Sequence, residues 1–237
     1  MTGLLYADSL RVTDFVHIRI PTVGEIMDNE EVFNEMVSVV VSTPYELMVP
    51  LDDIGVDFNQ VSHFDVFCML FTKLQTQDVS LLFGDTDFSG YKYAIRKDTN
   101  EGEWFDERTG SRIDRLVHVQ MCAALRKILQ ISVNDKKPGN EEARKYMLDR
   151  ARRKARRRKK ENVSQLESYI IALVNSRDFK YDYHTVRDIT IYQFYQSLQQ
   201  ISHKIQFDNT MIGYYTGSIK FDDISQQNKS WILTTTN

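Results

Sequence analysis

The chain contains little cysteine, proline or glycine, and each shortage narrows what the protein can be. Its 237 residues include 2 Cys, 4 Pro and 10 Gly, so we expect neither a disulfide scaffold nor a fold dominated by loops. Cys68 and Cys122 stand alone in helix-like apolar patterns, and no CxxC pair occurs. We therefore expect two buried free thiols and synthesis in a reducing cytoplasm.

Long apolar runs and secretion signals are missing as well. The most apolar stretch, residues 37–51, is interrupted by Pro44, Pro50 and several polar side chains, so we expect no membrane-spanning segment. The N-terminus lacks a basic region followed by a long apolar one, and we expect no signal peptide.

Motifs for catalysis or ligand binding are scarce. No GxxxxGKS/T or GxGxxG loop occurs, and the five histidines are far apart. We therefore predict no enzyme activity, no catalytic residues, no metal and no cofactor. Residues 85–90 begin like a calcium loop, but Arg96 stands where calcium needs a carboxylate. A turn whose Asp and Ser side chains cap its own backbone explains this segment equally well.

The strongest positive feature is a basic run. Residues 144–160 hold eleven Lys and Arg against one acid, a local charge of +10, so the rest of this −3 chain carries −13. Such an asymmetry predicts an interaction with a partner. The predicted partner-binding residues are Arg150, Arg152, Arg153, Lys154, Arg156, Arg157, Arg158, Lys159 and Lys160.

Three interpretations of the basic run stay open: contact with an acidic protein surface, contact with nucleic-acid phosphates, or a solvated helical arm without a partner. On a helix these charges cover every face, so they cannot all meet one groove. Aromatic residues that would favour base stacking are absent from 147–168. Because the apolar stripe stops where the charge is highest, we expect this stretch to project into solvent or onto a partner.

Hydrophobic periodicity predicts an α+β protein that is predominantly helical, with a small antiparallel meander in the N-terminal half. Residues 79–83, 91–95 and 103–105 supply the three short β-like runs of this meander, which lies near 79–107. The other expected elements are a strand at 14–20, a helix from Thr22 to 41 stopped by Pro44, a helix capped by Ser62, and an amphipathic helix at 113–129.

The C-terminal half predicts a long charged helix after the turn-forming residues 134–140. Residues 141–177 can form one helix, or two joined near Asn162. Thr190 and Gln193 have capping-box spacing and predict a further helix. We thus predict a mixed part at 1–135 and a helical part at 136–237 with the basic arm at 144–160, and the two parts can form one domain.

Two further groups have a structural interpretation. The acidic pair Asp52 and Asp53 lies in a turn context and is interpreted as a cap. An aromatic cluster in the C-terminal half is interpreted as core packing at a helix–helix junction, with a binding surface as the alternative. Its members are Phe179, Tyr181, Tyr183, Tyr192, Phe194 and Tyr195.

Several segments in this order resemble a group of phage proteins. These segments are residues 20–26, 53–57 leading into 64–67, Gly139-Asn140 at the start of a charged helix, 164–168, 190–194 and 213–231. Together they are similar to small proteins encoded in the tail and baseplate modules of tailed bacteriophages that infect Gram-positive hosts. The resemblance implies a role in virion assembly, in some members as a chaperone, and it supplies no catalytic residues.

The resulting functional hypothesis is a non-enzymatic phage tail or baseplate assembly factor, or a minor structural protein of the virion. It would act by protein–protein contact with other tail or baseplate proteins that have acidic surfaces, in the host cytoplasm during assembly. The alternative is a nucleic-acid-binding module that uses the basic helix 144–160. The sequence leaves open whether the protein stays in the particle and whether it forms a homo-oligomer.

Overall fold

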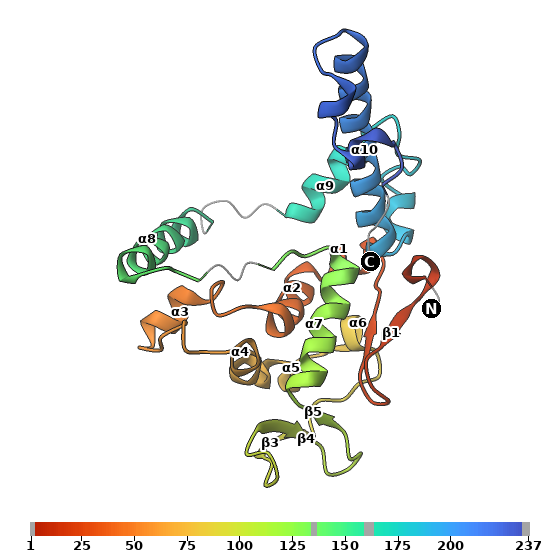
Figure 1. Cartoon of the computed structure of the whole chain (residues 1–237). Helices are drawn as coiled ribbons and strands as arrows, with labels where there is room; N and C mark the ends of the chain where they lie inside the picture. Colours follow the sequence, from red (N-terminus) through yellow and green to blue (C-terminus); the bar gives the residue numbers. More distant parts are fainter. Residues whose placement is uncertain (1–2, 134–136, 159–163, 234–237) are drawn as a thin grey trace. The chain divides into compact units, whose positions relative to one another are not determined.

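The computed structural model describes residues 3–133, 137–158 and 164–233. Contacts divide the chain into two compact units. The first unit comprises residues 1–21 and 25–163, and the second comprises residues 22–24 and 164–237. The division falls after Val163, so residues 141–158 group with the N-terminal part, whereas the sequence analysis placed them with the helical part. The fold is α+β and mostly helical, which confirms the predicted class (Figure 1).

The first unit begins with a hairpin of β1 (Ser9–Arg11) and β2 (His17–Arg19), which pair antiparallel. The strand expected at 14–20 is thus confirmed only in its second half, because residues 12–16 form the turn. Helices α1 (Val23–Asp28) and α2 (Glu30–Val41) follow, separated at Asn29 and ending before Pro44. The single helix expected here is therefore two.

The short helix η1 (Leu4–Tyr6) precedes the hairpin. The short helices that follow α2 are α3 (Met48–Asp53), α4 (His63–Leu70), α5 (Thr72–Thr76) and α6 (Ser80–Phe83), and the longer helix α7 (Arg115–Leu129) comes after them. Ser62 caps α4 in a complete capping box with Asp65, as predicted. Asp114 caps α7 by accepting a hydrogen bond from the backbone N–H of Val117.

An aromatic core holds the first unit together. Phe71 is fully buried and contacts Phe88, Tyr91 and Trp104 at ring-centroid distances of 5.5, 5.9 and 4.3 Å. Helix α2 packs against α4, α5 and α7 around this core. Buried aromatic rings contribute large apolar areas and favourable edge contacts, so this cluster is expected to dominate the stability of the unit.

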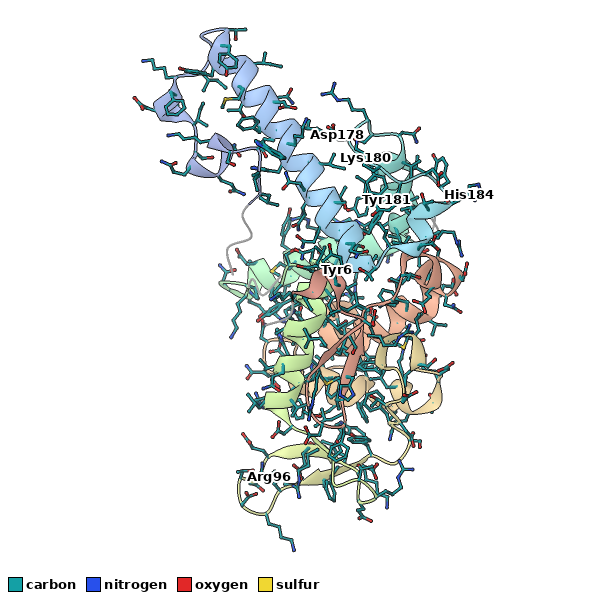
Figure 2. All side chains as sticks on the ribbon, turned by 90° about the vertical axis from the view of Figure 1, so that its right-hand side faces the viewer. Tyr6, Arg96, Asp178, Lys180, Tyr181 and His184 are labelled. Carbon is teal, nitrogen blue, oxygen red and sulfur yellow. The ribbon has the colours of Figure 1, made fainter. Side chains whose placement is uncertain are left out.

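The meander is present, and the runs expected at 91–95 and 103–105 are two of its strands, whereas the third strand differs from the one expected. It consists of β3 (Lys92–Ile95), β4 (Gly102–Phe105) and β5 (Arg112–Ile113) in the order β3-β4-β5; Figure 2 shows Arg96 beside the β3–β4 hairpin. The strand predicted at 79–83 is wrong, because this segment contains helix α6. The Asp78 carboxylate accepts from the Ser80 N–H and Gly84 ends the turn with φ +59, so a helical turn buries Leu82 and Phe83.

The remaining helices are α8 (Glu141–Arg158) in the first unit and α9 (Gln165–Val174) and α10 (Ile191–Tyr215) in the second. Of the two alternatives predicted for residues 141–177, the structure has the one with two helices. Thr190 caps α10 in a complete capping box with Gln193, as expected. Short helices η2 (Thr185–Asp188), η3 (Phe221–Asp223) and η4 (Gln226–Lys229) complete the second unit.

The N-terminal residues 22–24 belong structurally to the second unit. Thr22 forms an antiparallel bridge with Thr190, and the Val23 N–H donates to the Ile189 carbonyl over 2.9 Å. Leu166, Ile170 and Leu173 of α9 and Phe194 of α10 are buried. Among the helices that the structure describes, none is long and apolar enough to cross a membrane.

Candidate interaction surface

Helix α8 has an apolar face that fixes it to the first unit. Leu148 is only 5% exposed and joins a small core with Tyr45, Met48, Leu51 and Phe58, and Met147 and Ala151 pack against the same core. Helix α8 thus lies on α3. The expectation that the basic stretch projects from the protein is wrong for this part of it, because Leu148 extends the apolar spacing of Met147 and Ala151 into a buried stripe.

Two arginines beside this stripe bind acids of the same unit. The Arg152 Nη2 lies 2.9 Å from Asp52 Oδ2 and 2.7 Å from Asp53 Oδ1. The Arg144 Nη2 lies 3.4 Å from Asp52 Oδ1 and its Nε lies 3.5 Å from a carboxylate oxygen of Asp57. The hydrogen bond to Asp53 is the largest influence raising the pKa of Arg152. Arg152, a predicted partner-binding residue, therefore has an intramolecular partner.

The acidic residues at the end of α3 have a different role from the one expected. Asp52 and Asp53 are the last two residues of α3, and their side chains accept hydrogen bonds from Arg144 and Arg152. Their interpretation as caps is replaced by one as anchors of α8. The Arg144 guanidinium also lies over the Phe58 ring, 5.2 Å from its centroid, so the charged contact continues the apolar one.

The opposite side of α8 carries the exposed cations. Tyr146, Arg150, Arg153 and Lys154 line one groove, because residues spaced four, seven and eight apart share one side of a helix. We call these four residues the basic face. Tyr146 is 63% exposed, and the three cations are exposed too. Within the described ranges, none of these cations forms an ion pair.

The other predicted partner-binding residues follow the basic face in the sequence. Arg156 is exposed. Arg157 and Arg158 belong to α8, and Lys159 and Lys160 lie outside the described residues. Arg152 contacts Asp52 and Asp53, so the members of the set whose side chains are described divide into one docked residue and four exposed ones, Arg150, Arg153, Lys154 and Arg156.

In the segment that begins like a calcium loop, the Asp87 carboxylate accepts hydrogen bonds from the protein itself. The Asp87 carboxylate accepts from the Ser89 N–H at 2.8 Å and from Arg108 Nη2 at 3.0 Å. Hydrogen bonds from the Ser89 side chain and from its backbone N–H, together with the one from Arg108, lower the pKa of Asp87 to about 2. In the described part of the chain, no group of three or more His, Cys, Asp or Glu side chains could hold a metal ion.

One buried histidine and one buried cysteine of α7 lie together. The His118 ring stacks on Phe67 with centroids 4.5 Å apart, and its Nε2 lies 2.9 Å from the Val40 carbonyl oxygen and 3.3 Å from Cys122 Sγ. Burial lowers the pKa of His118 to about 4 and raises the pKa of Cys122 to about 11. Both groups are therefore uncharged at neutral pH, so the pair packs the core and supplies no thiolate nucleophile.

The aromatic cluster of the second unit combines core and surface. Phe179 and Phe194 are buried, whereas Tyr181 and Tyr183 are exposed. Figure 2 shows Tyr181 near Asp178, Lys180 and His184, in the connection between α9 and α10. The interpretation as core packing is thus confirmed for the two phenylalanines and wrong for the two exposed tyrosines.

Tyr146 and the acidic anchors of α8 were not predicted from the sequence. Tyr146 lies one residue before the stretch 147–168, which has no aromatic residue, and its spacing to Arg150 and Arg153 places all three on one side of the helix. No comparable signal links Asp52 to Arg152, because that contact joins residues 100 positions apart.

Residues 157–235 are similar to a family described as the YomV second domain, and YomV is a Bacillus phage-region protein. The matched range covers the second unit from α9 to η4. The matched family is phage-related, in agreement with that part of the resemblance. A search of the curated proteins found no match, and neither did a search of the solved structures.

Proposed function

We propose that this protein is a non-enzymatic assembly factor or minor structural protein of a phage tail or baseplate, acting by contact with other phage proteins. The observation that carries the proposal is the phage-related domain at residues 157–235. The resemblance of the wider chain to proteins of tail and baseplate modules supports the choice of tail or baseplate. Assembly in the host cytoplasm follows from this role.

The basic face supplies the contact in this proposal. Arg150, Arg153 and Lys154 are exposed on a helix whose other side is fixed by Leu148 and the Asp52 ion pairs. A fixed helix presents its charges in one orientation, which limits the side-chain and backbone freedom lost on binding. The fitting partner is an acidic surface on a tail or baseplate protein, because opposite charges steer association and select the orientation.

The test is deletion of the gene from the phage genome that encodes it. The expected result is lysates with heads but incomplete tails or baseplates in electron micrographs, and restoration of complete particles by the wild-type protein supplied in trans. The variant Arg150→Gln/Arg153→Gln/Lys154→Gln should restore them poorly. The control Lys92→Gln/Lys97→Gln/Lys127→Gln removes the same charge from exposed positions of the first unit and should complement fully. Complete, infectious particles from the deletion phage would reject the proposal.

A second candidate function is nucleic-acid binding, and the position of Tyr146 favours it. An exposed aromatic ring beside three cations combines a stacking surface with phosphate contacts, as in proteins that bind single strands. Binding to DNA that weakens steeply with salt would support this candidate, whereas saturable one-to-one binding to a phage protein supports the first.

A further inference from the structure

Helix α10 carries a heptad pattern along its whole length. Apolar residues recur at alternating spacings of three and four, the repeat by which two helices pack in a coiled coil. The pattern has one interruption, the acidic Asp208. Its positions are Ile191, Phe194, Leu198, Ile201, Ile205, Asp208, Ile212 and Tyr215. We call this stripe the α10 seam.

Burial of the α10 seam changes along the helix. Ile191 and Phe194 are buried in the second unit, while Ile205, Ile212 and Tyr215 are 49%, 60% and 79% exposed. The seam therefore begins inside the domain core and continues as an exposed apolar stripe. Large apolar side chains exposed along one side of a helix are unusual on a monomer surface and typically mark an interaction site.

The protein's own C-terminal segment covers a different side of α10. The His203 Nε2 lies 2.8 Å from the Ser230 carbonyl oxygen, and Gln200 Nε2 donates to the Trp231 carbonyl at 2.7 Å. At 100° per residue, His203 lies on the far side of the helix from Ile205. Figure 1 shows this segment returning alongside α10. The C-terminal segment thus contacts the side of α10 that lies opposite the seam.

We infer that the exposed half of the α10 seam pairs with the same seam of a second copy of this chain. A repeat of 3.5 residues matches another helix, because it keeps the apolar stripe facing a partner helix over several turns. Every copy presents the same stripe, so a two-fold arrangement is self-complementary. The seam lies within residues 157–235, so the dimer is a property of the phage-related domain.

Asp208 fits this pairing as the polar position of the seam. Its carboxylate lies 3.0 Å from Lys204 Nζ, one helical turn away. One polar residue in a coiled-coil seam lowers stability and fixes the register of the helices. The open seam is also short, so the dimer forms reversibly and its population depends on concentration.

Light scattering of the purified full-length chain over a concentration series tests the inference. The expected mass approaches twice the 27.8 kDa of one chain and falls on dilution. Ile205→Glu and Ile212→Glu each place a charge in the seam and should raise the dimer dissociation constant by at least about tenfold. Gln206→Glu adds the same charge at an exposed neighbouring position outside the seam and should leave the dimer unchanged. Circular dichroism checks that each variant is folded.

Asp208→Leu provides a test in the other direction, which does not depend on the glutamate variants folding. Leu completes the apolar seam and should lower the dissociation constant by about tenfold or more. A chain that stays monomeric at every concentration overturns the inference. A dimer that is insensitive to Ile205→Glu, Ile212→Glu and Asp208→Leu overturns it as well, because the copies would then meet through another surface. Both results are independent of the proposed role in tail assembly.

Discussion

At the scale of single residues, His118 shows how burial turns an ordinary side chain into a determinant of pH stability. Its ring is almost fully buried, stacks on Phe67 and interacts with the Val40 carbonyl. Desolvation is the largest cause of its low pKa, about 4 against an ordinary value of 6.5. The unfolded chain therefore binds this proton more readily than the folded protein does, so protonation favours unfolding.

The predicted consequence is a loss of stability as the pH falls. The contribution of neutral His118 is fully present above about pH 6.5 and is lost progressively as the pH falls to about 4. A shift of this size corresponds to about 3 kcal/mol. His118→Gln keeps an N–H donor for the Val40 carbonyl but does not titrate. Urea denaturation across this pH range should therefore show a shallower dependence for the variant than for the wild type. Parallel curves would contradict the assignment.

At the scale of elements, α8 depends on apolar anchoring as well as on its ion pairs. Replacing a buried Leu by Ala costs about 2–5 kcal/mol, from lost burial and the cavity that remains. We predict that Leu148→Ala undocks α8 and increases hydrogen exchange across Glu141–Arg158. Lys145→Ala, at an exposed position of the same helix, should change the free energy of unfolding by less than about 0.5 kcal/mol. Equal protection in both variants would show that Arg144 and Arg152 alone fix the helix.

The elements that the sequence predicted well are those whose determinants are local. The capping boxes of Ser62 and Thr190 each lie within four residues, and both helices begin where the spacing placed them. The segment 79–83 was misassigned because a four-residue apolar run fits a strand or a buried helical turn equally. The docking of α8 was also missed, since it depends on Asp52, which lies 100 positions from Arg152.

The candidate surface was predicted by charge but not by geometry. The basic run correctly marked α8 as the most charged helix, and Arg150, Arg153 and Lys154 are exposed there. Charge counting could not divide the run into a docked side and an exposed side, because both carry arginines. That division follows from Leu148 and from the acids at the end of α3, which only the folded chain brings to α8.

At the scale of the whole molecule, the protein is acidic but exposes the three cations of the basic face, which form no ion pair within the described ranges. The chain has a net charge of −3, so any binding to a polyanion must come from a local patch working against the total charge. Three cations of the basic face can each neutralise one phosphate. Each neutralised phosphate of a single strand adds about 0.7 to the slope of log affinity against log salt concentration. The basic face can therefore account for up to about 2 units of that slope.

This arithmetic separates the two candidate functions. If the basic face binds phosphates, fluorescence anisotropy with a short single-stranded DNA should give a steep slope. The variant Arg150→Gln/Arg153→Gln/Lys154→Gln should lose up to about 2 units of it. The control Lys92→Gln/Lys97→Gln/Lys127→Gln carries the same net charge, so it should keep most of the slope if the effect is local. Equal losses of slope in both variants would show that total charge, and not the basic face, determines the binding. No measurable DNA binding at low salt would reject nucleic acid as the partner of the basic face.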